Sequence, residues 1–369
     1  MAVQRYSSGE VKIARTSWLK IMLTNNEYRG KEWKIDSWES NVEAFATDKP
    51  TGSNYQFINY LRTRDNSVSE ILVGLLHPKK RIHPKFFYDD RGAELFDRIT
   101  VTEDYYPTNA ELEILQNNAA DLAAAVGSNG VLVEPGCGSC TKVMALLPHL
   151  CPAMYVPIDI ASQPLQRAAQ QLVERFPYLR CTAIAADFVD LSFLSPLLPA
   201  LPRTVFYPGS TIGNFEPADA IVFLRGLRAM IGRDGGLLIG VDKENSEDIL
   251  NQAYNDREGI TEKFNLNILE NINRTAVANF EVRNFEHEAF YNASEHRVEM
   301  HLRSTCIQSV TVAGQKIEFT KGELIHTENS YKYSVSAFES LAAEAGFIRS
   351  RTWHDSRDLF SVHYFMPAC

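Results

Sequence analysis

The sequence predicts an α/β fold built on a doubly wound, mostly parallel sheet. Between residues 130 and 243, apolar strand segments alternate with amphipathic helical segments, which is the pattern of such a sheet. Within this region the apolar segment LVEP at 132–135 runs into a Gly-x-Gly turn, and a second strand segment ends at Asp159. Ligands of doubly wound folds bind at the carboxyl ends of the strands, so this arrangement predicts a nucleotide-type site at that edge.

The part of the chain before the sheet is predicted to be mostly helical. Residues 1–53 are rich in Lys, Glu, Asn and Ser and are expected to form an N-terminal arm, with one amphipathic stretch at 11–23. Apolar periodicity then predicts helices at 55–76, 92–99 and 109–126. We assign these helices to the same unit as the sheet.

The following segments predict the order of the sheet and of an insertion into it. Strands are predicted at 131–134, 154–159, 181–186, 204–207 and 235–242, with helices at 139–148, 162–176 and 217–232. After residue 246 the spacing predicts a helical tract to 276 and an antiparallel excursion with strands at 284–293, 296–312, 315–320 and 327–333. A helix at 335–345 and a hairpin of 347–353 with 359–366 close the chain. We therefore divide the chain into an arm at 1–53, a core at 54–245 plus 326–369, and an insertion at 246–325.

Composition and charge limit the classes of partner. The chain has 369 residues, an apolar share of 45% and a formal net charge of −9, and its longest basic cluster is Lys79-Lys80-Arg81. An acidic chain without a basic patch argues against binding to nucleic acid or to an anionic membrane. Since no apolar run approaches the ~20 residues of a membrane helix, we expect a cytoplasmic, monomeric protein that acts on a small molecule.

Two features favour S-adenosylmethionine over a nicotinamide dinucleotide as the ligand. Thr141 stands where the third glycine of a dinucleotide-binding G-x-G-x-x-G turn would fall. The third strand ends in Asp187 and Phe188, which offer a carboxylate for the adenine amino group and an aromatic cover for its ring. Acids at the ends of three successive strands, Glu134, Asp159 and Asp187, suit an adenosyl ligand with no phosphate to repel. S-Adenosylmethionine is therefore the predicted cofactor.

Cys137 and Cys140 have the C-x-x-C spacing of a redox pair or of half a zinc site. No second C-x-x-C or H-x-x-x-H motif accompanies them, and the six cysteines are scattered through the chain. We therefore expect reduced thiols, no metal, and small side chains in a tight turn beside the ligand.

Three motifs together resemble the histidine Nα-methyltransferases of ergothioneine biosynthesis. They are FYDDRGAELFD at 87–97, EDYYPT at 103–108 and GSTIGNF at 209–215. The resemblance extends over roughly residues 54–367 and leaves out only the arm. It implies a Rossmann-like methyltransferase core with a smaller α+β substrate domain, formed by the N-terminal helices and the late insertion. It also implies that free L-histidine is trimethylated to hercynine with three molecules of S-adenosylmethionine.

The resemblance also implies roles for individual residues. Those around the substrate amine and carboxylate, where the transfer occurs, are Tyr88, Tyr105, Asn214 and Tyr254. The substrate pocket is completed by Gly209, Met300, Glu328 and Ser330. The cofactor residues are Gly136, Gly138, Lys142, Asp159, Asp187 and Phe188. Because an amine that is free of its proton is already a nucleophile, we expect no dedicated strong base.

Recognition of the imidazole is implied for Glu328 and Ser330. Two residues apart on one strand, they project from the same face and can reach one ring. A carboxylate can accept an imidazole N–H while a hydroxyl contacts the other ring nitrogen. Without the resemblance, the same pair would be taken for an exposed strand face.

Three alternatives are kept beside this interpretation. The first is N-methylation of another amino acid or amine, such as tryptophan, and the second is a non-catalytic binding protein on a methyltransferase fold. The third, a nicotinamide oxidoreductase, is disfavoured by Thr141. The glycine turn itself departs from the family, because Pro135, Cys137 and Cys140 replace Leu, Ser or Thr, and Ser.

Overall fold

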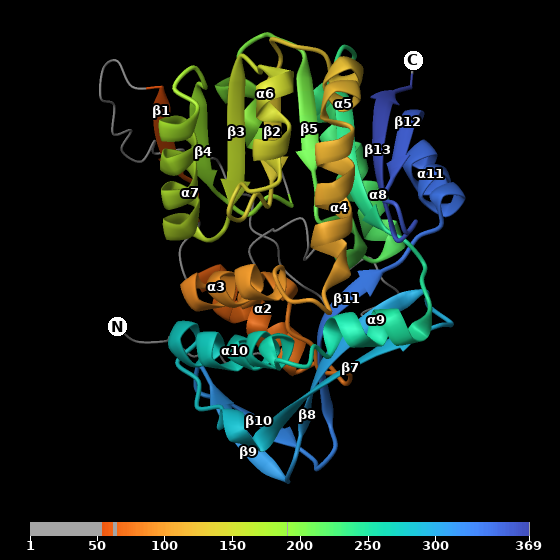
Figure 1. Ribbon diagram of the computed structural model, residues 1–369. Coiled ribbons are helices and arrows are strands. Elements are labelled where there is room, and N and C mark those ends of the chain that lie inside the picture. Colours follow the sequence, from red (N-terminus) through yellow and green to blue (C-terminus); the bar gives the residue numbers. More distant parts are fainter. Residues whose placement is uncertain (1–53, 62–64, 190, 369) are drawn as a thin grey trace.

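The computed structural model describes residues 54–61, 65–189 and 191–368, so the expected arm at 1–53 lies outside the described residues. In the described part, an eight-stranded sheet has the order β1-β4-β3-β2-β5-β6-β13-β12 (Figure 1). All neighbours from β1 to β6 in this order are parallel, and β13 runs antiparallel to both β6 and β12. The strands are Tyr55–Asn59 (β1), Val131–Pro135 (β2), Met154–Asp159 (β3), Cys181–Ala185 (β4), Arg203–Tyr207 (β5), Gly236–Asp242 (β6), Phe347–His354 (β12) and Phe360–Pro367 (β13).

The winding direction of the sheet reverses between β2 and β5. The chain passes from β2 outward to β3 and β4, then returns to β5 beside β2 and continues to β6 on the other side. A crevice forms at such a switch point, outside the carboxyl ends of the strands. The predicted doubly wound α/β fold is confirmed.

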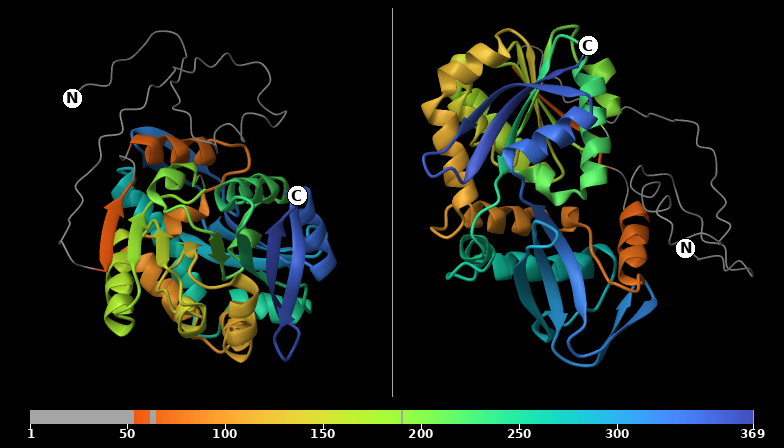
Figure 2. Two further views of the ribbon diagram at one scale, coloured as in Figure 1. Left: turned by 90° about the horizontal axis from the view of Figure 1, so that it is seen from above. Right: turned by 90° about the vertical axis from the view of Figure 1, so that its right-hand side faces the viewer.

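Helices cover both faces of this sheet (Figure 2). Leu132 and Phe206 share one apolar cluster with α4, α5 and α7, whereas Val133 and Val205 share a second cluster with α8 and α11. Because successive residues of a strand point to opposite faces, strands that are apolar throughout need both layers. These helices are Tyr106–Asn117 (α4), Ala119–Val126 (α5), Ser162–Arg175 (α7), Pro217–Ile231 (α8) and Val335–Glu344 (α11).

A second unit lies against the carboxyl ends of the parallel strands (Figure 1). It contains a three-stranded antiparallel sheet in the order β11-β8-β7 and a β9–β10 hairpin, and α10 contacts β7, β8, α2 and α3. The elements are Asp65–Leu75 (α2), Pro84–Phe87 (η2), Asp90–Ile99 (α3), Glu247–Tyr254 (α9), Ile260–Thr275 (α10), Phe285–Asn292 (β7), Arg297–Ser304 (β8), Gln308–Val312 (β9), Gln315–Phe319 (β10) and Leu324–Tyr331 (β11). This is the expected α+β unit, built from the N-terminal helices and the late insertion.

Strand β11 belongs to the sheet of the second unit, although the division by sequence ends the insertion at 325. Glu328 lies opposite Met300 and Ser330 lies opposite Val298, both on β8. We therefore propose that the second unit extends to the end of β11, and that the core resumes with α11.

Local side-chain contacts explain where two of these helices begin. The Asp89 carboxylate accepts a hydrogen bond of 2.7 Å from the Gly92 amide at the start of α3, and Ser334 accepts one of 3.2 Å from Ala337 at the start of α11. Each side chain satisfies an amide that has no partner within its own helix. After α11 the chain leaves through Gly346, whose φ of +87° favours glycine.

Periodicity misassigned three segments. The start of the helix expected at 55–76 is strand β1, which pairs in parallel with the otherwise open edge of β4. The helix expected at 139–148 is a turn followed by η3 (Val143–Ala145) and the short α6 (Leu147–Leu150). The strand expected at 296–312 is divided into β8 and β9. In the described residues no helix combines the length and apolar character that crossing a bilayer requires.

Candidate active site

A cavity of about 720 Å³ lies where the carboxyl edge of the main sheet meets the second unit. Its volume is in the usual range of small-molecule sites. Every residue that the sequence singled out for a site lines this cavity: Tyr88, Tyr105, Gly136, Gly138, Lys142, Asp159, Asp187, Phe188, Gly209, Asn214, Tyr254, Met300, Glu328 and Ser330. The fold thus brings residues from distant parts of the chain to one place.

The loop after β2 forms one end of the cavity. Gly136 and Gly138 have φ of +69° and +52°, a region that favours glycine. The Gly136 amide donates to the Ile158 carbonyl at 2.7 Å. Both oxygens of Asp159 accept backbone amides, from Gly138 and Ala161, each at 2.9 Å. The loop backbone is therefore tied to the end of β3, which holds Asp159 in the lining.

Phe188 lies directly over the glycine turn. A Cβ added at Gly136 would stand 3.3 Å from the Phe188 ring, which is closer than an ordinary contact, so the ring lies near the bare backbone of the turn. Asp187 beside it is half-exposed, and one of its oxygens lies 3.5 Å from the Lys85 ammonium. A flat apolar ring next to a carboxylate and a bare backbone fits an adenosyl group.

Glu111 links the helix α4 to the loop after β5. This fully buried carboxylate lies 2.7 Å from the Lys142 ammonium and accepts the Gly209 amide at 2.9 and 3.0 Å. A Cβ at Gly209 would stand 3.0 Å from the Lys142 nitrogen. The ammonium is thus held at the cavity wall between the two loops. A cation at this point fits the carboxylate of an amino acid moiety.

Glu134 lies beneath the glycine turn, at the end of β2. Burial raises its pKa to about 8, against the opposing effect of a 2.5 Å hydrogen bond from the Tyr155 hydroxyl. A carboxyl group that is largely protonated near pH 7 adds no negative charge beside the ligand.

Aromatic rings form the wall between the two ends of the cavity. Tyr88 packs edge-on against Phe96 and Phe264, each with centroids 5.7 Å apart, and Tyr105 packs edge-on against Tyr254 at 6.1 Å. Burial raises the pKa of all three tyrosines well above 10. Their hydroxyls therefore remain protonated near pH 7 and act as neutral hydrogen-bonding groups.

The other end of the cavity is made by β11 and its neighbours. Glu328 accepts a 2.9 Å hydrogen bond from the Asn214 amide nitrogen, and Ser330 accepts one of 2.7 Å from the Tyr254 hydroxyl. Burial raises the pKa of Glu328 to about 8. Met300 lies opposite Glu328 on β8 and supplies an apolar surface beside it. The residues expected at the imidazole and those expected at the amine are direct partners.

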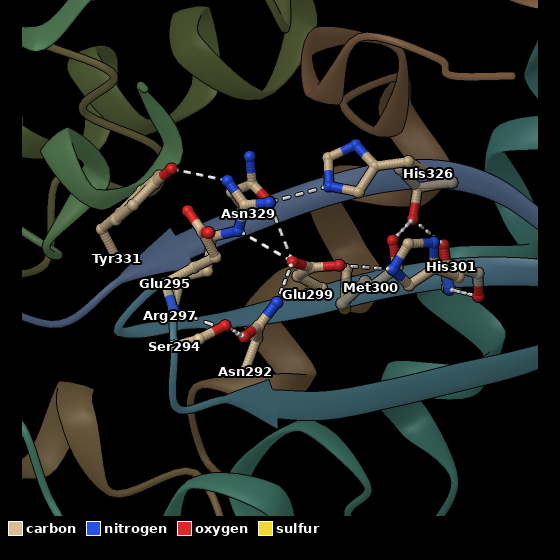
Figure 3. A network of polar contacts seen from close by, with 12 residues as sticks. Asn292, Ser294, Glu295, Arg297, Glu299, Met300, His301, His326, Asn329 and Tyr331 are labelled. Carbon is tan, nitrogen blue, oxygen red and sulfur yellow. Dashed lines mark hydrogen bonds and ion pairs between the residues drawn. The ribbon is translucent and has the colours of Figure 1, made fainter. Parts of the chain in front are cut away.

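The opposite face of β11 carries a polar network in which the Tyr331 hydroxyl accepts a hydrogen bond from Arg297 (Figure 3). Asn329 and Tyr331 donate to the two oxygens of Glu216 at 2.9 and 2.5 Å, and Arg297 lies 3.1 Å from the same carboxylate. Glu216 directly precedes α8 and lies two residues after Asn214. We define these four residues, Glu216, Arg297, Asn329 and Tyr331, as the Glu216 cluster. It connects the second unit to the loop that carries Asn214.

Comparison with known proteins decides the family. A family profile described as a histidine-specific, S-adenosylmethionine-dependent methyltransferase matches residues 67–367. The chain belongs to this family. Two relatives named histidine N-alpha-methyltransferase, from Mycolicibacterium smegmatis and Mycobacterium tuberculosis, are each 35% identical over 299 residues, which cover 79% of this chain and 92% of theirs. Ergothioneine biosynthesis protein 1 of Neurospora crassa is 29% identical over 76% of this chain and 33% of its own length.

The chain is thus a methyltransferase that uses S-adenosylmethionine, and its cavity fits that cofactor. The glycine turn, the Phe188 ring and the Asp159 carboxylate provide backbone, apolar cover and hydrogen-bond acceptors in the places that an adenosyl group needs. Cys137 and Cys140 are buried in this turn, and burial raises the pKa of the Cys137 thiol well above its usual range. In the described residues, no group of three or more His, Cys, Asp or Glu is placed to hold a metal.

Sequence reasoning missed three buried charged residues of this methyltransferase. Glu111 anchors Lys142, whereas Lys332 on the chain just after β11 pairs with Asp242 at 2.6 Å. Asp242 ends the apolar strand β6, so the signal that found Asp159 also applies to it. Glu111 and Lys332 have no such signal, because their burial depends on packing between distant elements.

Proposed function

We propose that this methyltransferase transfers methyl groups from S-adenosylmethionine to the α-amine of free L-histidine, three times, to give hercynine. The observation that carries the proposal is the group of hydrogen-bonding side chains at the β11 end of the cavity. Glu328 and Ser330 share one face there with Asn214 and Tyr254 as partners. A carboxylate and a hydroxyl side by side match the two nitrogens of an imidazole.

The cofactor is assigned to the end of the cavity near β2 and β3. In this proposal Asp159 accepts the ribose hydroxyls, while Asp187 and Phe188 hold the adenine. Gly136 and Gly138 line the amino acid end, and the Lys142 ammonium faces its carboxylate. S-Adenosylmethionine supplies an electrophilic methyl group and leaves as a neutral thioether, so no acid has to assist.

The protein's own part in the reaction is to orient the amine and exclude water. Asn214 uses its amide nitrogen on Glu328, which leaves its amide oxygen to accept an N–H of the substrate amine. Tyr88, Tyr105 and Tyr254 surround the same region with rings and neutral hydroxyls. Orientation of this kind contributes several kcal/mol to a transfer reaction. The α-ammonium of the substrate loses its proton with a pKa of about 8 to 9, so a modest lowering of that pKa or a route through water suffices and no strong base is required.

The test is mass spectrometry of the protein incubated with S-adenosylmethionine and an equimolar mixture of free amino acids. We expect a single modified product, histidine with up to three added methyl groups. Glu328→Ala should reduce that product at least tenfold, because it removes both the ring contact and the partner that orients Asn214. S-Adenosylhomocysteine should still bind, since Glu328 is assigned no contact to the cofactor. Methylation of a different amino acid would retain the chemistry and overturn the substrate assignment.

The alternatives differ in that experiment. Methylation of tryptophan or another amine would indicate an N-methyltransferase with a different substrate. Cofactor binding without any product would indicate a non-catalytic binding protein. Cytoplasmic location, a monomeric state and the absence of nucleic-acid partners remain predictions from the sequence.

A further inference from the structure

A buried ammonium lies behind the substrate end of the cavity. Lys332 follows β11 two residues after Ser330, and its side chain is fully buried. Its nitrogen lies 2.6 Å from Asp242, 2.9 Å from Ser330 Oγ and 3.1 Å from the Tyr254 hydroxyl. An ammonium has three N–H groups, so these three contacts use all of them.

These contacts determine how the hydroxyl hydrogens are arranged. The ammonium only donates, so both hydroxyl oxygens must accept from it. Tyr254 also donates to Ser330, which gives Ser330 Oγ two incoming hydrogen bonds and leaves its own hydrogen unused by this group. If Ser330 instead donated to Tyr254, the hydroxyl hydrogen of Tyr254 would be the one that this group leaves unused. In either arrangement the pair has one hydrogen to offer to the cavity that both residues line.

The carboxylate partner, which itself lines the cavity, is held by a second hydrogen bond. The other oxygen of Asp242 accepts a 2.7 Å hydrogen bond from the Tyr106 hydroxyl. Both Asp242 and Lys332 are completely removed from solvent. Apolar residues of similar size commonly replace a buried ion pair without loss of stability, so stability alone does not account for this one.

We propose that Lys332, held by Asp242, is a positioning residue that makes Ser330 and Tyr254 a fixed hydrogen-bond donor toward the unprotonated ring nitrogen of the substrate. This inference rests on the proposed function, since it requires a substrate with such a nitrogen. Glu328 accepts the N–H of the same ring, so the site as a whole selects a neutral ring with one donor and one acceptor.

The experiment compares two ligands that differ only in the ring. Histidine and 3-(2-thienyl)alanine both carry a five-membered ring, but the thiophene has neither an N–H nor a basic nitrogen. Their dissociation constants are measured by calorimetry on the complex with S-adenosylhomocysteine. The variant is the double substitution Lys332→Met with Asp242→Asn, which removes both buried charges together. Tyr106→Phe is the control, because it removes a contact to Asp242 without touching Ser330 or Tyr254.

We expect the double variant to bind histidine at least tenfold more weakly, with the affinity for thienylalanine changed less than twofold. The Tyr106→Phe control should leave the ratio of the two affinities as in the wild type. If the affinities for both ligands fell equally, Lys332 would have only a structural role in connecting the end of β11 to β6, and the proposal would be overturned. If the double variant does not fold, Lys332→Met alone is used, which removes every hydrogen bond that Lys332 donates to Ser330 and Tyr254, and an unchanged affinity ratio would again overturn the proposal. Failure of the wild type to bind histidine would instead contradict the proposed function.

Discussion

At the scale of single residues, burial sets the protonation of the groups that contact the substrate. Glu328 has its pKa raised to about 8 because the cavity removes it from water. One of its oxygens accepts the Asn214 amide, so the other is left for the ligand. A carboxyl group accepts an N–H strongly only when it is ionised. Ligand binding at Glu328 should therefore depend on pH in a range where an ordinary carboxylate does not titrate.

We expect the affinity for hercynine to increase about tenfold from pH 7 to pH 9. With a pKa of about 8, the ionised fraction of Glu328 rises about tenfold over that range, since it is small below the pKa and nearly complete above it. Hercynine is the suitable probe because its quaternary amine carries no titrating proton. Calorimetry at constant ionic strength, with S-adenosylhomocysteine bound, gives the dissociation constants.

Glu328→Gln separates this effect from that of Glu134, whose pKa is also raised to about 8. The glutamine carbonyl accepts an N–H at any pH, so the variant should bind hercynine with little change between pH 7 and 9. A variant that keeps the full tenfold increase would assign the titration to another group.

At the scale of elements, β11 is held to the core from both faces. Alternate residues of a strand point in opposite directions. Glu328 and Ser330 therefore face the cavity, while Asn329 and Tyr331 point the other way and belong to the Glu216 cluster. Gly213 packs so closely on this strand that a Cβ there would stand 2.8 Å from the Tyr331 carbonyl. The position of the proposed ring-binding pair thus depends on contacts behind it.

Glu216→Gln should weaken this attachment. The substitution removes the charge that Arg297, Asn329 and Tyr331 share, and we expect the free energy of unfolding to fall by about 1–2 kcal/mol. The histidine KM should rise severalfold, whereas S-adenosylhomocysteine affinity should stay within twofold. Denaturant unfolding and steady-state kinetics measure the two effects.

Glu286→Gln is the matched control for that prediction. Glu286 forms an exposed ion pair with Arg303 at 2.9 Å on β7 and β8, remote from the core, where such pairs contribute about 0–1 kcal/mol. If both variants raised the histidine KM equally, the Glu216 cluster would have no specific role in positioning β11.

The elements that sequence could predict are those whose apolar pattern is decided locally. Helix α7 and strands β2 to β6 were predicted within a few residues, because their apolar periodicity is strong and their ends carry turn residues. Strand β1 was missed because its pairing depends on an edge that β4 provides from far along the chain. The segment at 139–148 has helical periodicity, but the glycine turn just before it bonds to the end of β3, and only short helical turns follow.

For the candidate site, sequence could name the residues of the cavity but not their partners. The family resemblance implied Glu328, Ser330, Asn214 and Tyr254, and the structure places all four in one lining. That they form two hydrogen-bonded pairs, with Lys332 behind one of them, follows only from how β11, α9 and the end of β6 pack together. Their individual roles remain predictions.

At the scale of the whole molecule, neither unit contains a complete site. The core contributes the glycine turn, Asp159 and Asn214, whereas the second unit contributes Tyr254 and β11. One apolar cluster extends from the sheet through α4 into α10 and β8, so the two units share a core. A substrate bound between them should therefore stabilise segments on both sides, while the cofactor alone should affect mainly the core.

Amide hydrogen exchange can distinguish the two contributions. S-Adenosylhomocysteine should slow exchange at 136–142 and 159–162, and adding hercynine should extend protection to 253–256 and 328–332. At a concentration of about 100 times its dissociation constant, a ligand stabilises the folded protein by about 2.7 kcal/mol. Amides that exchange only when the site opens and the ligand dissociates should therefore exchange about 100-fold more slowly. The β9–β10 hairpin contributes nothing to the cavity lining and serves as the internal reference. Protection that stays within 136–162 after hercynine is added would place the substrate on the core alone, and β11 would then have no part in binding it.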